Sequence, residues 1–131
     1  MTHAEFMDVR NHGFVRVAVV VPGVRVGDPI ENVENHLEQL RSVYEKGACY
    51  AVGPELGLTG YTCGDLFHSS ALHRATEKAL RHLLDETRDW DMVISVGMPV
   101  PVDQAVYNAA LTISGGSIVA VVPKVYLPEY R

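Results

Sequence analysis

Blocks of apolar residues, separated by stretches rich in polar residues, glycine and proline, predict an alternation of strands and helices along the chain. The segment Phe14–Val21 is rich in β-branched residues and almost wholly apolar after Arg16. This pattern is typical of a strand that is buried on both faces. We therefore expect Phe14–Val21 to be a central strand of a sheet, and we expect Pro22 and Gly23 to end it.

The next block has the spacing of an amphipathic helix. Asp28 is of a type that caps free N–H groups, Pro29 suits the first helical position, and Gly47 is typical of the residue after a helix. Between these signals, apolar residues recur every three or four positions: Ile30, Val33, Leu37, Leu40 and Tyr44. This spacing predicts a helix that covers one face of a sheet.

A second strand and a second helix follow. Cys49–Gly53 predicts a short strand, which Pro54 ends because proline has no N–H for the ladder. After the polar stretch 55–64, Asp65 is predicted to cap a second long helix. The apolar side of that helix would consist of Leu72, Ala75, Ala79, Leu80, Leu83 and Leu84.

The last third of the chain predicts strands alone. Met92–Gly97 is the third predicted strand. Val106–Ser114 and Ser117–Val122 flank the pair Gly115-Gly116, which is the signal of a two-residue hairpin. The predicted order is strand, helix, strand, helix and then three strands. This order indicates an α/β fold that begins parallel and closes with an antiparallel pair.

The final residues predict that more of the domain follows. The segment Pro123–Arg131 is extended in character, with two prolines, two tyrosines and three charged residues. No predicted element follows that could cover the sheet face created by the last hairpin, and open apolar surface is typical of an interface. We therefore expect residues 1–131 to be the N-terminal portion of a larger domain that is incomplete at its C-terminus.

Composition and charge exclude several classes of protein. Hydrophobic residues make up 47% and charged residues 21%, as in a globular chain and unlike a disordered one. The net charge of −5 disfavours a nucleic-acid partner. The apolar runs 17–21 and 118–122 are far shorter than the roughly 20 residues of a membrane span, and no signal peptide is visible. Two cysteines without metal-ligand spacing predict no disulfide framework and no metal site. We expect a cytoplasmic protein.

Two charged residues of opposite sign follow a strand and a proline, in Pro54-Glu55 and Pro123-Lys124. Ligands of open α/β sheets bind at the carboxyl ends of strands. A partly apolar crevice there would raise the pKa of Glu55 and suit it to general-base catalysis, while a protonated Lys124 would stabilise an oxyanion. The alternative is that Glu55 caps a helix or faces water and that Lys124 is an ordinary surface lysine.

The cysteines and histidines are weaker candidates. Cys49 begins an apolar strand and is predicted to be a small buried hydrophobe. Cys63 precedes a helix whose N-terminus would lower its pKa and make it a nucleophile, although Asp65 opposes thiolate formation and the neighbours are turn residues. Three histidines of the second predicted helix are expected to face solvent or to pack rather than bind metal: His68, His73 and His82.

Two pairs of segments resemble known enzymes. Gly53–Tyr61 and Val121–Tyr130 together resemble the nitrilase superfamily, the carbon–nitrogen hydrolases, in order and separation. More narrowly, Thr59–Phe67 and Tyr126–Tyr130 are similar to the glutaminase domain of glutamine-dependent NAD synthetases. The resemblance covers most of the chain. It implies that the chain is the first part of a nitrilase-like four-layer αββα sandwich.

The resemblance implies roles for four residues. It makes Glu55 the general base and Lys124 the lysine that stabilises the oxyanion. It also makes Tyr61 and Tyr130 part of the wall of a glutamine pocket. The bulky apolar residue that the family usually carries two positions before the glutamate is Gly53 here. This departure predicts looser packing behind Glu55.

The third member of the family's catalytic triad, a nucleophilic cysteine, has no counterpart in these residues. It lies well downstream of the residue matched by Lys124, a place that neither Cys49 nor Cys63 occupies. The pair Tyr107-Asn108, ahead of the last hairpin, also resembles the family. Because the nucleophile is missing, the 131-residue chain alone is expected to be inactive.

The function implied by the resemblance is the hydrolysis of the glutamine side-chain amide by covalent acyl transfer. The ammonia would serve an ATP-dependent synthetase domain that converts deamido-NAD to NAD. No cofactor is expected for the glutaminase domain, whereas ATP and Mg are expected for the synthetase domain. The implied partners are glutamine, the rest of the chain, and further copies in a homo-oligomer. Two alternatives stay open: a stand-alone nitrilase-type amidase or carbamoylase, and a non-catalytic small α/β binding module.

Overall fold

The computed structural model describes residues 2–128, which form one mixed sheet with helices. The strands lie in the order β1-β2-β3-β4-β5. The pairs β1–β2 and β2–β3 are parallel, and the pairs β3–β4 and β4–β5 are antiparallel. The elements are α1 (His3–Met7), η1 (Val9–His12), β1 (Val17–Val19), α2 (Pro29–Glu45), β2 (Tyr50–Val52), η2 (Gly64–His68), α3 (Ser70–Glu86), β3 (Val93–Val102), β4 (Ala105–Ser114) and β5 (Ser117–Pro123).

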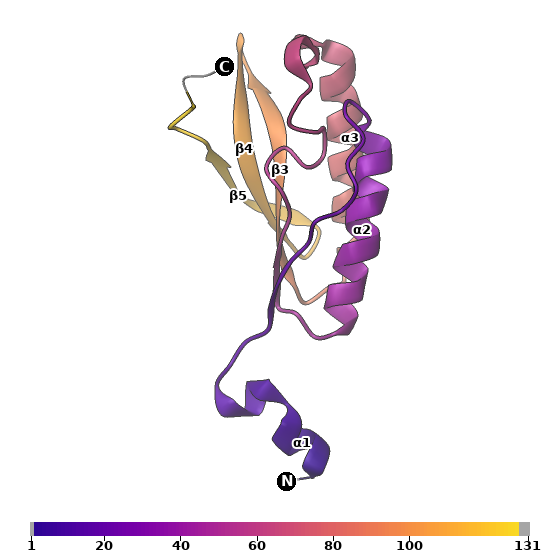
Figure 1. Ribbon diagram of the computed structural model, residues 1–131, viewed down its shortest axis with the longest axis vertical. Helices are drawn as coiled ribbons and strands as arrows, with labels where there is room; N and C mark the ends of the chain where they lie inside the picture. The colour runs from indigo at the N-terminus through magenta and orange to yellow at the C-terminus, as the bar shows by residue number, and fades with distance from the viewer. Residues whose placement is uncertain (1, 129–131) are drawn as a thin grey trace.

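The two long helices, α2 and α3, lie on the same side of the sheet (Figure 1). Each one connects two parallel neighbours, α2 between β1 and β2 and α3 between β2 and β3. Crossovers of the usual right hand place helices on one face when the strands are added in one direction. The predicted α/β class is therefore confirmed, and the opposite face of the sheet carries no helix of the described residues.

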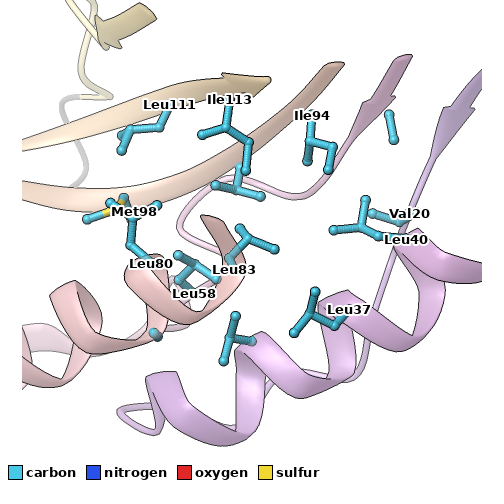
Figure 2. Close-up of a cluster of buried hydrophobic side chains, with 14 of the residues drawn as sticks. Val20, Leu37, Leu40, Leu58, Leu80, Leu83, Ile94, Met98, Leu111 and Ile113 are labelled. Carbon is cyan, nitrogen blue, oxygen red and sulfur yellow. The ribbon is translucent and has the colours of Figure 1, made fainter. Parts of the chain in front are cut away.

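The hydrophobic core fills the space between the two helices and the sheet (Figure 2). The helices contribute leucines, β3 and β4 contribute branched residues and a methionine, and Leu58 enters from the loop after β2. The labelled members are Val20, Leu37, Leu40, Leu58, Leu80, Leu83, Ile94, Met98, Leu111 and Ile113. Burial of this apolar surface is the main stabilising contribution to the fold.

The start of α2 confirms the predicted helix signals. Asp28 is its N-cap and accepts a hydrogen bond from the backbone N–H of Glu31, at 3.1 Å, while Pro29 occupies the first turn. The helix ends at Glu45. Ile30 was predicted to lie on the apolar side but is exposed, because the buried stripe of the helix begins elsewhere in the first turn, at Pro29 and Asn32.

The prediction of a central first strand that is buried on both faces is wrong for the described residues. β1 is the edge strand of the sheet and is only three residues long. Val17 and Val19 are 61% and 74% exposed, whereas Val20 just beyond the strand is buried. Apolar residues on both faces of a strand indicate that both faces can be buried. They do not indicate whether another element of the described residues covers each face, or where the strand lies in the sheet.

The second long helix begins later than predicted. Asp65 belongs to the 3₁₀ helix η2, which also contains His68. The cap of α3 is Ser69, and the helix begins at Ser70. A turn of 3₁₀ helix ahead of an α-helix is a common arrangement. A residue such as Asp65 inside that turn has the side chain of an N-cap, so from sequence alone it suggests that the α-helix begins there. His73 and His82 lie in α3 as predicted.

β3 and β4 form a long hairpin that the sequence pattern did not predict. β3 continues past the predicted end at Gly97 to Val102, and Val102 pairs with Ala105 next to the turn. β3 contains Pro99 and Pro101, although proline is disfavoured inside a sheet because it has no N–H for the ladder. These prolines are tolerated because β2 pairs with β3 only as far as Ser95, so that the later part of β3 has only β4 as a neighbour.

The sheet face opposite α2 and α3 is largely apolar. Paired residues of neighbouring strands share one face, and on this side the register aligns Val17 with Tyr50 and Ala110 with Val122. Tyr50 and Ser95 are joined by a hydrogen bond of 2.9 Å between their side chains. We call this side of the sheet the open face. Within residues 2–128, none of the helices combines the length and apolar character that a membrane crossing requires.

Candidate active site

Glu55 lies in a tight turn that is bound to the end of the sheet by backbone hydrogen bonds. The N–H of Gly53 donates to the carbonyl of Ser95 at 2.9 Å, and the N–H of Leu58 donates to the carbonyl of Gly97 at 3.1 Å. Both acceptors belong to β3. The turn is therefore fixed on both sides of Glu55, at the carboxyl end of β2.

A glycine of β3 lets this turn approach the sheet closely. A Cβ atom on Gly97 would overlap the backbone nitrogen of Leu56 and would lie 2.6 Å from the carbonyl oxygen of Pro54. Leu56 itself has a φ of 52°, in the left-handed region that residues other than glycine rarely adopt. Strained backbone of this kind is typical of functional sites and persists only where the surroundings hold it.

A buried histidine supports the turn from the helix side. His36 of α2 is fully buried, and a Cβ on Gly53 or Gly57 would lie 3.3 Å or 2.8 Å from its Nε2. The looser packing expected behind Glu55 is therefore not found, because the imidazole of His36 fills that space. The carbonyl of Asn32 lies 2.8 Å from Nδ1, so Nδ1 carries the proton of the neutral ring. Burial lowers the pKa of His36.

The two junctions of strand, proline and charged residue, predicted separately, meet at one end of the sheet. Lys124 Nζ lies 2.8 Å from Glu55 Oε1 and forms an ion pair with it. Asn108 of β4 donates from Nδ2 to the same oxygen at 2.5 Å. The two side chains of the ion pair remain 35% and 42% exposed. Glu55 and Lys124 are therefore paired with each other, and they are not two separate surface charges.

The pKa of Glu55 shifts in the direction opposite to the one expected. The hydrogen bond from Lys124 lowers the pKa most, burial raises it, and the hydrogen bond from Asn108 lowers it further. The net result is a lowered pKa. The expected rise is wrong because the carboxylate faces an ammonium group and an amide donor, both of which stabilise its charged form.

The Glu55–Lys124 pair borders two hollows of the surface. One lies on the open face and is lined by residues of β2, β3, β4 and β5, among them Ser95 and Ala110. The other is lined by Glu55, Lys124, Tyr61, Phe67, Leu56, Asn108, Leu127 and Pro128. Tyr61 therefore lines a hollow beside the ion pair, and its contact with a substrate stays a prediction. Tyr130 lies outside the described residues.

Neither cysteine is placed as a nucleophile would be. Cys49 is exposed, contrary to the predicted burial, because it precedes β2 instead of belonging to it. Cys63 is buried, and its thiol donates to the carbonyl of Thr59 at 3.1 Å. A thiol that is buried and bonded to backbone carbonyls is not presented to a substrate.

The two histidines of α3 lie among residues of the helices and not beside the Glu55–Lys124 pair. His82 Nε2 lies 2.8 Å from a carboxylate oxygen of Glu34 on α2. His73 is partly buried, and its Nδ1 has no hydrogen-bond partner among residues 2–128. Over the same residues, no three His, Cys, Asp or Glu side chains are grouped as a metal ion would require.

Two residues of the site were missed as functional candidates. In the sequence, Asn108 belongs only to the pair Tyr107-Asn108 that resembles the family, although its alternation along β4 places it on the open face with Ala110. The sequence pattern predicts no functional role for His36. Its signal was a polar residue beside Leu37 on the helix side that faces the sheet, where a polar ring must find a specific partner.

Residues 16–131 match the model of the carbon-nitrogen hydrolase family. The chain therefore belongs to this family, and the paired Glu55 and Lys124 lie inside the matched region.

The chain is similar in sequence to several glutamine-dependent NAD(+) synthetases. The glutamine-dependent NAD(+) synthetase of Mycobacterium tuberculosis is 40% identical over 126 residues, which cover 96% of this chain and 19% of the relative. The synthetase of Mycobacterium leprae is 34% identical over 97% of the chain, and that of Thermotoga maritima is 31% identical over 88%. The chain spans about a fifth of the length of these relatives.

Solved structures agree on the fold. A glutamine-dependent NAD(+) synthetase from Cytophaga hutchinsonii matches with a TM-score of 0.81 and 22% identity, over 88% of this chain and 20% of that one. An amidase from Nesterenkonia sp. AN1, with an acetamide moiety bound covalently at its active-site cysteine, matches with a TM-score of 0.76 and 23% identity, over 88% and 45%. The described residues therefore have the fold of the first part of a nitrilase-like domain.

Proposed function

We propose that residues 1–131 are the N-terminal portion of the glutaminase domain of a glutamine-dependent NAD synthetase. The observation that carries the proposal is the contact of 2.8 Å between Glu55 and Lys124, inside a chain that is 40% identical to such a synthetase. The binding-module alternative would not need two oppositely charged side chains converging beside a strained turn and a hollow.

The proposed reaction is covalent acyl transfer with a cysteine from the part of the domain that follows residue 131. Glu55 takes the thiol proton, and the thiolate attacks the side-chain amide carbon of glutamine. Lys124 stabilises the oxyanion of the tetrahedral intermediate. The carbon–nitrogen bond then breaks, ammonia leaves with the proton that Glu55 held, and water releases glutamate from the thioester. The lowered pKa keeps Glu55 ionised near neutral pH, as a base requires.

Substrate contacts and partners belong to the same proposal. Tyr61 lines the hollow beside the pair and would contact glutamine there, and Tyr130 is proposed for the same wall. The glutaminase steps use no cofactor. ATP and Mg would serve the synthetase domain, which passes the ammonia to deamido-NAD. Homo-oligomerisation, a location in the cytoplasm and the absence of nucleic-acid and membrane partners stay predictions.

A stand-alone amidase is the second candidate, because the Nesterenkonia amidase shares the fold over 88% of this chain. The two candidates differ in what the full-length protein does with ammonia. A synthetase converts deamido-NAD to NAD with ATP and glutamine, and an amidase releases ammonia without forming NAD. Mass-spectrometric detection of NAD in that reaction mixture separates them.

The role of Lys124 is tested in the full-length protein with Lys124→Ala. Removal of an oxyanion donor costs on the order of 10²–10³ in rate, so we expect near-total loss of ammonia release from glutamine. Lys78→Ala, at a lysine on α3, is the control and should keep the wild-type rate. If Lys124→Ala keeps more than about a tenth of the wild-type turnover, far above the range expected for such a donor, the assignment is wrong.

The role of the missing nucleophile is tested with the 131-residue chain itself. We expect no glutamine-dependent ammonia release from it, because Cys63 is buried and bonded to backbone carbonyls. Release that disappears in Cys63→Ser would instead make Cys63 the nucleophile and would contradict the proposed mechanism.

A further inference from the structure

Asn108 contacts both members of the charged pair. Its side-chain Nδ2 lies 2.5 Å from Glu55 Oε1, and its backbone carbonyl accepts the N–H of Lys124 at 2.7 Å. Asn108 lies within the ladder of β4, opposite Pro99 of β3, so its backbone is held by the sheet. One residue of a rigid strand therefore connects the glutamate and the lysine.

The orientation of the amide follows from the chemistry of its neighbour. The lowered pKa keeps Glu55 ionised, and an ionised carboxylate only accepts hydrogen bonds. The Asn108 amide must therefore turn its NH₂ group, and not its carbonyl, toward Glu55. Lys124 donates to the same oxygen, so Oε1 accepts two donors. Among residues 2–128, no group donates to Oε2.

We propose that Asn108 is a positioning residue, which orients Glu55 so that Oε2 is the oxygen that receives the thiol proton. This inference rests on the proposed function. Both hydrogen bonds occupy lone pairs of Oε1, so the proton goes to Oε2, whose lone pairs accept no hydrogen bond from residues 2–128. With Oε1 fixed by β4 and by the end of β5, Oε2 is directed away from these two donors.

The groups around Glu55 determine how loss of the Asn108 amide would change the orientation and the pKa of the carboxylate. The titratable groups that line the hollow around Glu55 are Lys124, after β5, and Tyr61, in the loop before η2. His68 of η2 lines the next hollow, together with Asn108. Without the Asn108 amide, Lys124 alone would hold Oε1, and the carboxylate could rotate. The pKa of Glu55 would rise, because one stabilising donor is lost.

The test uses the full-length protein and compares Asn108→Leu, which removes the amide, with Asn108→Ser, which keeps a small polar group too short to reach Glu55. The readout is kcat and KM for glutamine hydrolysis across pH. Misplacement of a catalytic group by about 1 Å can cost on the order of 10²-fold. We expect kcat to fall by about tenfold to a hundredfold with a smaller change in KM, and the acid limb of the profile to move to higher pH.

The matched control is Thr112→Val on the same face of β4. It removes the hydrogen bond of 2.9 Å between Thr112 and Ser95, four residues from Asn108. We expect wild-type kcat and an unmoved acid limb, which separates positioning of Glu55 from a general effect on the strand. Equal kcat losses in Asn108→Leu, Asn108→Ser and Thr112→Val, with no shift of the acid limb, would overturn the proposal.

A direct measurement keeps the inference separate from the proposed function. In protein labelled with ¹³C at the glutamate carboxyl groups, comparison with Glu55→Gln assigns the Glu55 signal, and its titration gives the pKa. A higher pKa in Asn108→Leu and in Asn108→Ser supports the inference, even if the wild-type protein releases no ammonia and the proposed function fails. A pKa equal to that of the wild type in both variants overturns the inference, even if glutamine is hydrolysed.

Discussion

The two junctions that bring charge to the site are held in different ways. The turn of Glu55 is crowded: Gly97 lies against its backbone, His36 packs beneath it, and hydrogen bonds to β3 fix it on both sides. Lys124 follows β5, whose residues are all exposed, and its backbone N–H bonds to Asn108. Both junctions have the same order of strand, proline and charged residue, yet only one is built into the core.

This difference predicts that substitutions at the two junctions have different effects on stability and on activity. Disturbing the packing around Glu55 should affect folding as well as activity, because buried atoms leave no room for displacement. Disturbing Lys124 should affect activity with only a small effect on stability, because its contacts lie at the surface. The following variants test this division, beginning with the largest expected effect on stability.

Gly97→Ala should be the most destabilising change. The added methyl group would overlap the backbone of Leu56 and Pro54, which is not a flexible side chain that can move aside. Overpacking of this kind costs about 1–3 kcal/mol in the free energy of unfolding, which chemical denaturation measures. Gly23→Ala is the control, because nothing lies within 4 Å of its added Cβ and its φ is not left-handed. Equal unfolding free energies for the two variants would contradict the crowded turn.

His36 should make stability depend on pH. Its folded pKa is lowered from an ordinary value of 6.5, so below about that pH the unfolded chain binds more protons than the folded chain. The contribution of His36 is therefore fully present above pH 6.5 and is lost as pH falls toward the lowered folded value.

The measurement is the urea midpoint at several pH values, for the wild type and for His36→Gln. The pH dependence should become flatter in the variant, which cannot titrate at this position. Parallel curves for the wild type and His36→Gln would show that the buried ring is not responsible.

Lys124→Ala should have the smallest effect on stability, although it should have a large effect on activity. Both side chains of its ion pair are more than a third exposed, and pairs of this kind contribute about 0.2–1 kcal/mol. Arg81→Ala, which breaks an exposed pair with Glu77 on α3, is the matched comparison and should give a similar change in chemical denaturation. A loss above about 2 kcal/mol, twice the upper value for exposed pairs, would place Lys124 in the stabilising framework instead.

Local signals predicted local structure well. The cap at Asp28 and the hairpin at Gly115-Gly116 were both confirmed, because each depends on chemistry within a few residues. The β3–β4 hairpin was missed because its turn carries no glycine; Asp103 adopts the left-handed φ of 53° there. The edge position of β1 was also missed, since strand order depends on contacts between distant segments.

The site was predicted in part. The positions of Glu55 and Lys124 at strand ends followed from the pattern, and the structure brings them together as the pair would require. The predicted direction of the Glu55 pKa shift was wrong, because hydrogen bonds from Lys124 and, to a smaller extent, from Asn108 outweigh the effect of burial, and both donors are distant in the chain. The support from His36 was missed for a related reason: a polar residue on the sheet-facing side of α2 indicates that a partner is needed, but it does not indicate which distant segment supplies that partner.

The β3–β4 hairpin also has a consequence for the order of folding. Its strands are joined by a two-residue turn, and hairpins of this kind form within about 1–10 μs. The pairing of β2 with β3 must instead close a long crossover through α3, and the entropy of that closure is lost before its contacts form. We therefore expect Gly97 to be in place before the Glu55 turn docks on it. The Glu55 carboxylate would be among the last groups of this sheet to reach its position, after the β3–β4 hairpin has formed.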